Sequence, residues 1–521
     1  MRHPWDRRLG IWYIAEHHPH QPAVVDCPSG VTLTFGELAG RAHQLVHALR
    51  AHGVGRGDVV AFALPNDVNP LIWLLAMQES GMHAISLNPA LTAHELDMIL
   101  EHSGASVLAV HERLRDHVAA CPAAARVSVR VAVGGPIDEF VPVEDFVAGA
   151  STDLPDDRSW GTPISYSSGT TGAPKAIVRP VPVDADPSEI ADQAKAFGHA
   201  FRFRPLEGVH LVSAGMHHGG CQSFYLGALN VGQALAIMGR FDPEAALAAI
   251  ERHRVTTAYM VPTQFVRLLR LPKEVRERYD LSSLEVVVHS AAPCPREIKQ
   301  QMFDWLGPII WETYGGMEGA ATIAKPHRWL ERPGTVGRAV AGMSVKILDD
   351  DGNELPPGQI GTVYMHMKTG EFEYFKDKQK TEHARHGRFF TVGDVGYLDE
   401  EGWLYLSDRK TDMIISGGAN IYPAEIESVL IMHPKVADVA VFGIPHPDWG
   451  EEVKAVVEPI DGVDGGPALE AEILTWAADK LAKYKTPRSI DFVAELPRDP
   501  NGKLYKRKLR DPYWEGHERA I

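Results

Sequence analysis

The chain has 521 residues, of which 45% are hydrophobic and 23% are charged, and its net charge is −16 at pH 7. This length predicts two or more domains, and the negative charge argues against nucleic acid or an anionic membrane as the main partner. We expect neither a secretory signal nor a membrane span, because the N-terminus lacks a sustained apolar segment and no apolar stretch is long enough to cross a bilayer.

Four cysteines are scattered along the chain, at Cys27, Cys121, Cys221 and Cys294. Their spacing matches neither disulfide pairing nor a metal site, so we expect a reduced, cytoplasmic protein. The sequence does not determine the oligomeric state, and a homodimer is one of the states that it allows.

Helical and strand patterns alternate in the first part of the chain. Residues 33–54 place apolar side chains on one helical face, and Gly53, Gly55 and Gly57 are expected to end the helix. The short apolar runs "DVVAFAL", "HAISLNP", "SVLAV" and "RVAV" are typical of buried strands, and "NPLIWLLAMQESG" is typical of a helix. This alternation predicts a layered, mostly parallel sheet. Residues 136–163 are rich in Pro, Gly and Asp and are predicted to form a loop.

The segment "YSSGTTGAPK", residues 166–175, contains two glycines, two serines, two threonines and a closing lysine. Its hydroxyls and successive backbone N–H groups can form a nest for anionic oxygens, with Lys175 as a point charge. The pattern therefore favours a loop that wraps a polyphosphate, and a flexible surface linker is the alternative. It is not the P-loop of the NTPases, because Pro174 stands where the second glycine is required and Ala176 follows the lysine.

Beyond this loop the alternation resumes. Residues 234–269 predict strand, helix and strand, with Asp242 placed to cap the helix before Pro243. From about Gly334 the pattern changes to short strands and tight turns, which predicts a smaller β subdomain. Residues 389–414 have the character of a hairpin, with "DEEG" as its turn.

A domain boundary is predicted between Asp408 and Asp412, before a compact α+β segment. The elements expected in that segment are helices at 421–430 and 471–484 and strands at 436–445 and 451–460. The predicted fold is α/β. A large N-terminal domain, residues 1–410, has several subdomains, layered mostly parallel sheets and a small β subdomain. A small α+β C-terminal domain, residues 411–521, follows.

Five motifs in a fixed order give the chain a resemblance to a known family. They are "YSSGTTGAPK", "YGGMEG" at 314–319, "VGDVGY" at 392–397, "SDRKTDMIISGG" at 407–418 and "PRDPNGK" at 497–503. Together they resemble the adenylate-forming superfamily, and within it the AMP-forming carboxylate–CoA ligases, over nearly the whole chain. The resemblance implies an enzyme that joins an acid and ATP into acyl-AMP and pyrophosphate. It then passes the acyl group to a thiol and releases AMP.

The resemblance also implies a nucleotide site. The first motif would wrap the β- and γ-phosphates, the ring of Tyr314 would stack on adenine, and Asp394 would accept both ribose hydroxyls. Glu318 would hold Mg2+, because a carboxylate with phosphate oxygens is the usual magnesium arrangement. The residues implied for binding ATP or coenzyme A are Ser167, Ser168, Gly169, Thr170, Thr171, Gly172, Lys175, Ala292, Pro293, Thr313, Tyr314, Gly315, Asp394, Arg409, Gly417 and Gly418.

Taken singly, these residues also fit ordinary structural roles: Tyr314 a core aromatic and Asp394 a turn aspartate. One position departs from the family. Met317 stands where a threonine is usual, and it cannot donate that threonine's hydrogen bond to the α-phosphate. Binding of the α-phosphate is therefore expected to differ from the family pattern at this position. Val392 also replaces a frequent threonine, with less consequence.

The residues implied to be catalytic are Lys503, Thr170, Glu318 and His218. Lys503 would bridge the substrate carboxylate and the α-phosphate, where a cation favours the approach of two anions. No general base is needed, because the acid is already ionised at neutral pH. His217 and His218 are not a zinc pattern, since no third ligand lies at a useful spacing. One of them, His218 in our interpretation, would line the acyl site.

The resemblance further implies that the C-terminal domain is a mobile lid that turns about a hinge at Lys410 to Asp412, with Thr411 as the central residue. Gly417 and Gly418 would then lie along the pantetheine arm of coenzyme A.

The acceptor and the acid stay open. A carboxylate–CoA ligase is the leading interpretation, with loading of a carrier protein as the alternative. The amino-acid-activating members of the superfamily share an acidic residue that meets the amino group in the acyl site. No acidic residue stands between Ala214 and Gly220, so the resemblance implies that an amino acid is not the substrate. A non-catalytic nucleotide-binding protein is the alternative from another class, favoured only by Met317. The acid is expected to be apolar: fatty, aryl or steroid-like.

Overall fold

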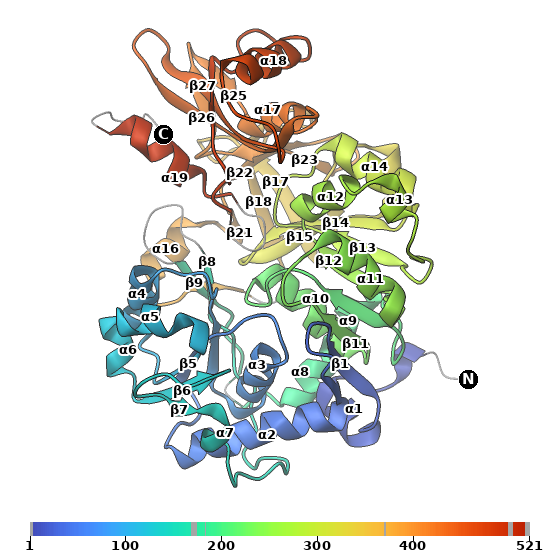
Figure 1. The fold of residues 1–521 in the computed structure, drawn as a ribbon, viewed down its shortest axis with the longest axis vertical. Coiled ribbons are helices and arrows are strands. Elements are labelled where there is room, and N and C mark those ends of the chain that lie inside the picture. The colour runs from blue at the N-terminus through green and yellow to red at the C-terminus, as the bar shows by residue number, and fades with distance from the viewer. Residues whose placement is uncertain (1–3, 168–174, 183, 369–370, 499–503, 516–521) are drawn as a thin grey trace. The chain divides into compact units, whose positions relative to one another are not determined.

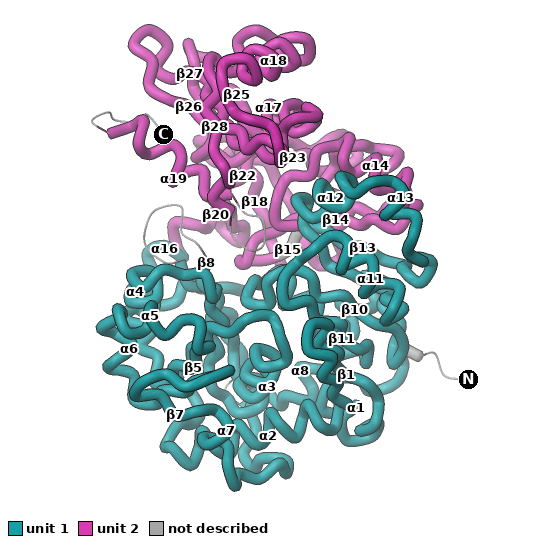
Figure 2. Tube along the Cα trace, in the orientation of Figure 1, with its two compact units in different colours: residues 1–289, 370–381 teal, residues 290–369, 382–521 magenta. Residues whose placement is uncertain are grey.

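The computed structural model describes residues 4–167, 175–182, 184–368, 371–498 and 504–515. The chain forms two compact units (Figure 2): residues 1–289 with 370–381, and residues 290–369 with 382–521. The predicted α/β class is confirmed. The division between these units falls elsewhere than the predicted domain boundary at 410/411. That boundary was predicted as the hinge of a mobile domain, which a division by compactness does not test, so it stays a prediction.

A five-stranded parallel sheet lies in the first unit, in the order β4-β3-β5-β6-β7. The apolar runs predicted as strands become β3 (Val59–Ala63), β4 (His83–Ser86), β5 (Val107–His111) and β6 (Val129–Val133), joined by the short β7 (Val141–Pro142). Helices α4 (Ala93–Ser103), α5 (Arg115–Ala119) and α6 (Pro122–Arg126) pack against this sheet (Figure 1), and share a buried core with β3 and β5.

Residues 136–163, predicted to be a loop, contain β7 and the four-residue helix α7 (Val143–Phe146). The prediction of an uninterrupted loop was therefore wrong. Pro142 precedes the helix as its N-cap, and the buried Phe146 ring stacks on His52, the C-cap of α2 (Phe35–Ala51), at 4.5 Å, which packs this turn against the end of α2.

A second, mostly parallel sheet of this unit has the order β2-β1-β11-β10-β12-β13. Its strands are β1 (Pro22–Asp26), β2 (Thr32–Thr34), β10 (Val209–Val212), β11 (Ala234–Ile237), β12 (Thr257–Met260) and β13 (Val286–His289). Only β2 runs antiparallel, because it is joined to β1 by a short turn. The other helices of the unit are α1 (Ile11–His17), α2 (Phe35–Ala51), α3 (Asn69–Ser80), α8 (Pro187–Gln193), α9 (Lys195–Ala200), α10 (Gly219–Asn230), α11 (Pro243–His253), α12 (Pro262–Leu269) and α13 (Lys273–Arg276).

Local capping explains where two of these helices begin. Helix α2 starts with a capping box in which Thr34 accepts from the Glu37 amide and Glu37 accepts from the Thr34 amide. Helix α11 starts at Pro243, and the Asp242 carboxylate accepts from the Ala245 amide at 2.8 Å, as the sequence predicts.

A small third sheet, β19-β9-β8, completes the first unit. Strands β8 (Ser165–Ser167) and β9 (Lys175–Val178) form an antiparallel hairpin, and β19 (Glu373–Tyr374) covers the other edge of β9. The β19 segment is also fastened by Lys376, whose ammonium donates to the backbone oxygens of His102 and Ser103 at 2.9 and 3.2 Å. Residues 371–381 thus return to a unit whose other residues all precede 290.

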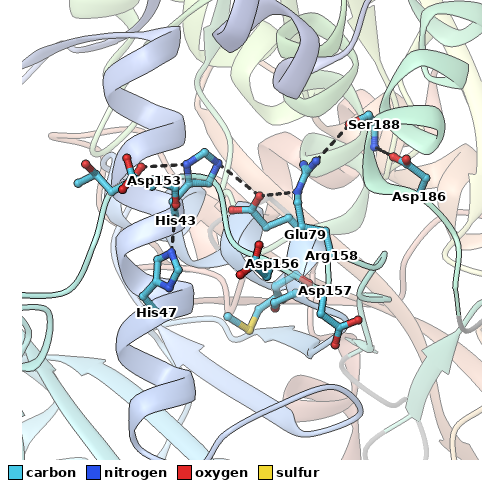
Figure 3. A network of polar contacts seen from close by, with 12 residues as sticks. His43, His47, Glu79, Asp153, Asp156, Asp157, Arg158, Asp186 and Ser188 are labelled. Carbon is cyan, nitrogen blue, oxygen red and sulfur yellow. Dashed lines mark hydrogen bonds and ion pairs between the residues drawn. The ribbon is translucent and has the colours of Figure 1, made fainter.

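A fully buried carboxylate, Glu79 at the end of α3, anchors the segment that precedes β8 (Figure 3). Its Oε2 accepts a hydrogen bond from Arg158 Nε at 3.3 Å and lies 3.4 Å from His43 Nε2 on α2. The Arg158 guanidinium lies 5.2 Å from the ring centroid of Trp12 and donates to Ser188 Oγ at 3.4 Å. The Glu79 side chain therefore links α2 and α3 to Arg158, in the segment that precedes β8 and the predicted phosphate loop.

We expect Glu79→Gln to lower the free energy of unfolding by about 2 to 3 kcal/mol, because it leaves the Arg158 charge inside the protein without its counter-charge. The midpoint of urea unfolding measures this loss. Glu139→Gln is the matched control: Glu139 pairs with Arg130 at 2.9 Å, but its side chain is 71% exposed, so little change is expected. Equal midpoints for Glu79→Gln and wild type would contradict the anchoring role.

The second unit contains a largely antiparallel sheet in the order β14-β15-β16-β23-β22-β18-β21-β20, with β17 paired to β18. The strands are β14 (Ile310–Gly316), β15 (Gly319–Ala324), β16 (Gly337–Ala339), β17 (Met343–Leu348), β18 (Gly361–Met367), β20 (Arg385–His386), β21 (Phe389–Phe390), β22 (Asp394–Leu398) and β23 (Trp403–Arg409). Helices α14 (Arg296–Leu306) and α15 (Pro326–Glu331) accompany them, and α16 (Lys378–His383) crosses the division between the units. Strands β22 and β23 form the predicted hairpin, with Asp399 accepting from Glu401 and Trp403 amides around the "DEEG" turn.

The C-terminal part of the second unit is α+β. Its sheet has the order β25-β24-β27-β26, with β28 parallel to β27. The elements are β24 (Ile414–Ser416), β25 (Ala419–Ile421), α17 (Pro423–Leu430), β26 (Val436–His446), β27 (Gly450–Pro459), α18 (Pro467–Ala478), β28 (Ser489–Phe492) and α19 (Lys506–Arg510). The helix predicted at 471–484 begins four residues earlier and ends six earlier. Pro467 starts it because a proline is favoured in the first helical turn.

Candidate nucleotide and acceptor site

The predicted phosphate loop connects the two strands of the β8–β9 hairpin. Ser167 and Lys175 are paired across its base. The predicted ligands Ser168, Gly169, Thr170, Thr171 and Gly172 lie outside the described residues. At the start of the hairpin, the Tyr166 hydroxyl lies 2.7 Å from His102 Nδ1, and burial raises the pKa of this phenol. This contact connects β8, the strand before the predicted phosphate loop, to α4.

Tyr314 and Asp394, predicted to contact adenosine, meet directly in the second unit. The Tyr314 hydroxyl on β14 donates to Asp394 Oδ2 on β22 at 2.8 Å. Arg409 is the cross-strand partner of Asp394, and its Nε lies 3.5 Å from Asp394 Oδ1. Burial raises the pKa of Asp394, while Arg409 and the Tyr314 hydrogen bond oppose the shift. A partly buried carboxylate held this way keeps lone pairs that can accept hydroxyl groups, as a ribose site requires.

The glycines after Tyr314 bring an acidic side chain close to the backbone. The pairing of β14 with β15 shifts register between Tyr314 and Gly315, which is a β-bulge within the motif. A Cβ built on Gly316 would come within 2.6 Å of Glu318 Oε2 and 2.9 Å of Val392 Cγ1, so glycine is required for the carboxylate to lie there. An oxygen ligand that is not fully buried fits Mg2+ held jointly with phosphate oxygens. Met317, in the turn between the two strands, adds no hydroxyl to this arrangement.

Ala292 and Pro293 lie in the turn between β13 and α14. Just before them, the Ser290 hydroxyl donates to the backbone oxygen of Thr313 at 2.8 Å. The Thr313 hydroxyl in turn donates to the backbone oxygen of Thr322 at 2.9 Å. The Ser290–Thr313 bond places this turn next to the backbone of residues 313–315. Both segments are predicted to line the nucleotide.

His217 and His218 precede and cap α10. His218 Nδ1 accepts from the Gly220 amide at 3.3 Å, so this imidazole is the N-cap of the helix. Burial lowers the pKa of His217 to about 3.

Gly417 and Gly418 form the two-residue turn between β24 and β25. Their φ angles are 57° and 81°, the combination of a type I′ hairpin turn, which favours glycine at both positions. The Gly417 amide donates to the backbone oxygen of Trp449 at 2.9 Å.

The sequence interpretation missed an aromatic surface beside this turn. The rings of Trp449 and His446 stack at 4.3 Å with an interplanar angle of 11°, and the Arg488 guanidinium lies 4.8 Å from the Trp449 ring centroid. Trp449 is 40% exposed. Its sequence signal was a tryptophan in the polar turn "HPDWGEE", outside any apolar run.

Lys503, the predicted bridging cation, lies outside the described residues. The described chain resumes at Leu504, and Lys506 on α19 pairs with Glu427 on α17 at 2.8 Å. The structure thus brings together Tyr314, Asp394 and Arg409, and Ser290 with Thr313. The roles of these residues stay predictions.

Among the described residues, no helix combines the length and the hydropathy that crossing a bilayer requires.

Two family models match this chain. Residues 11–370 match the AMP-binding enzymes, and residues 425–503 match the AMP-binding enzyme C-terminal domain. Feruloyl-CoA synthase of Amycolatopsis sp is 34% identical over 518 residues, covering 96% of this chain and 98% of that protein. A fatty acid–[acyl-carrier-protein] ligase of Streptomyces coeruleorubidus is 31% identical, covering 97% and 96%. Among solved structures, an anthranilate CoA ligase in complex with anthranoyl-AMP superposes with a TM-score of 0.85 at 26% identity, covering 99% of both chains. The chain therefore belongs to the AMP-binding enzymes, in the acyl-CoA synthetase branch of the adenylate-forming superfamily.

Proposed function

We propose that this enzyme is an ATP-dependent carboxylate–CoA ligase for an apolar acid of the fatty, aryl or steroid-like class. The first reaction joins the acid to the α-phosphorus of ATP and releases pyrophosphate; the second passes the acyl group to the thiol of coenzyme A and releases AMP. The proposed binding of the nucleotide rests on one observation: the Asp394 carboxylate is held between the Tyr314 hydroxyl and Arg409.

The other residues take complementary roles in this proposal. Glu318 would hold Mg2+, which supplies positive charge at the phosphates. Thr170 and the rest of the 167–175 segment would bind the β- and γ-phosphates, and Lys503 would draw the two anions together. His218 would line the acyl site. A cytoplasmic location is the expectation from the scattered cysteines.

The surface at Trp449 supports coenzyme A as the acceptor rather than a carrier protein. Coenzyme A carries an adenine and a 3′-phosphate that the pantetheine arm of a carrier protein lacks. The indole, stacked against His446 and flanked by Arg488, remains partly exposed, so it offers an aromatic edge to an adenine and a guanidinium to a phosphate. It is connected by a hydrogen bond to the Gly417–Gly418 turn, where the pantetheine arm is predicted to lie.

We expect Trp449→Ala to raise KM for coenzyme A by up to about tenfold, the loss expected for one edge contact between an aromatic ring and the adenine. KM for free pantetheine should stay unchanged, because pantetheine has no adenine. Thioester formation with both acceptors measures the difference. Tyr484→Ala is the control, since Tyr484 is another exposed aromatic of the same α+β segment, at 51% exposure. Equal losses with both acceptors would speak against a contact between Trp449 and the adenine.

The proposed function as a whole is tested by ATP–pyrophosphate exchange with a panel of carboxylic acids. Exchange that depends on one apolar acid, followed by thioester formation with free coenzyme A, is the expected result. Acylation of a carrier protein but not of coenzyme A would favour the alternative seen in the fatty acid–[acyl-carrier-protein] ligase. Absence of exchange with every acid would favour a catalytically weak nucleotide-binding homologue.

A further inference from the structure

A buried charge pair lies behind the strand that carries Tyr314. Lys299 on α14 donates to Glu312 Oε2 on β14 at 2.5 Å. The Lys299 side chain is fully buried and that of Glu312 is 11% exposed. The Lys299 ammonium also lies 4.7 Å from the ring centroid of Trp329 on α15.

Stability alone does not account for this pair. Removing two charges from water costs about as much as their attraction returns, so an apolar pair of similar volume is often as stable or more so. Burial disfavours the charged form of both groups: it lowers the pKa of Lys299 and raises the pKa of Glu312. What the pair provides that two apolar side chains cannot is one defined orientation.

Orientation matters at this strand because Tyr314 lies on it, close to the pair. Glu312 and Tyr314 are two residues apart, so they point to the same face of β14, and both are buried while Thr313 between them is partly exposed. The bulge directly after Tyr314 interrupts the ladder with β15. A slip of one residue would turn every side chain of a strand to the opposite face. A carboxylate that must meet a buried ammonium excludes that slip.

We propose that Lys299 and Glu312 are positioning residues for the nucleotide, because they fix β14 in the register in which the Tyr314 hydroxyl reaches Asp394. This inference rests on the proposed function, since it takes Tyr314 and Asp394 as contacts of adenosine.

The first test replaces the pair by apolar residues in the full-length enzyme, as Lys299→Met with Glu312→Leu. In ATP–pyrophosphate exchange, KM for ATP is expected to rise about tenfold while KM for the acid stays within about twofold. The melting temperature should stay within about 3 °C of wild type, because the apolar pair fills the same space. Glu312→Gln keeps the shape but offers the Lys299 ammonium only a neutral acceptor, which weakens the hydrogen bond that holds the register, so KM for ATP should rise in the same direction. This variant keeps the proposal testable if the double variant does not fold.

The second test asks whether the pair acts through Tyr314. In a Tyr314→Phe background the hydroxyl is already absent, so replacing the pair should raise KM for ATP by less than about twofold more. A purely structural role would give the same increase in both backgrounds. Lys454→Met is the matched control: Lys454 is also a buried lysine with a carboxylate partner, Asp491 at 2.6 Å, and KM for ATP should not change.

Additive effects of the pair and Tyr314→Phe, or an unchanged KM for ATP in a folded pair variant, would overturn the inference. Wild-type activity separates this failure from that of the proposed function: if wild type shows no acid-dependent exchange, the proposed function fails, whereas an active wild type with a neutral pair variant removes only the positioning role.

Discussion

Lys503→Ala is expected to slow acid-dependent ATP–pyrophosphate exchange about a hundredfold or more. The two reacting groups, a carboxylate and an α-phosphate, are both anionic. A fixed cation between them stabilises the charge that accumulates in the transition state by several kcal/mol. ATP binding should remain nearly intact, because the ribose and phosphate contacts proposed above involve other residues. The measurements are the exchange rate at saturating ATP and, separately, the affinity for ATP.

Lys508→Ala is the control for this substitution. Lys508 is an exposed lysine of the same C-terminal tail, on α19, and lies over the ring of Tyr505. Its removal lowers the local charge equally but should leave exchange unchanged. An unimpaired Lys503→Ala enzyme would remove the role assigned to Lys503, and a parallel loss of ATP affinity would point to a structural role.

Thr411→Pro is expected to spare acyl-AMP formation and to reduce thioester formation about a hundredfold, the cost of misplacing reacting groups by about an ångström. Thr411 lies in the turn between β23 and β24, where the Asp412 amide donates to the Arg409 backbone oxygen at 3.0 Å. Proline fixes φ near −65° and also restricts the residue before it. A hinge at this turn could then not absorb the change of backbone angles between the two half-reactions. Pyrophosphate release and thioester formation, measured side by side, give the ratio.

Glu400→Pro provides a matched proline control at the other end of the β22–β23 hairpin. Glu400 is the second residue of the "DEEG" turn, which is closed by the Gly402 amide and the Asp399 backbone oxygen at 3.0 Å. Proline is favoured at this position of a turn. Both half-reactions should be unchanged. Loss of both steps together in Thr411→Pro would contradict a hinge at that residue.

Local patterns were enough to predict much of the fold. The apolar runs of β3 to β6, the Asp242 cap of α11 and the "DEEG" hairpin depend on residues that are neighbours in the chain, so the sequence indicates them directly. The start of α18 was missed because the apolar pattern was taken without the proline that precedes it. The return of residues 371–381 to a distant sheet could not be predicted, because the pairing of β19 with β9 joins segments almost 200 residues apart.

The candidate site was predictable in its residue types but not in its contacts. The motifs singled out Tyr314 and Asp394, yet the hydrogen bond between them spans 80 residues and follows only from the pairing of whole strands. The Lys299–Glu312 pair gave no sequence signal at all, since a lysine and a glutamate thirteen residues apart are usually solvated. Trp449 did leave a signal, because a tryptophan in a polar turn has no core to fill.

The return of residues 371–381 has a consequence for biosynthesis. Strand β19 closes the open edge of β9, and Lys376 caps backbone oxygens at the end of α4. A nascent polypeptide that has emerged only as far as His289 therefore lacks part of its own first unit. That unit is complete only when translation has passed Thr381, so a truncated gene product ending at 289 would leave the edge of β9, next to the predicted phosphate loop, without its partner strand.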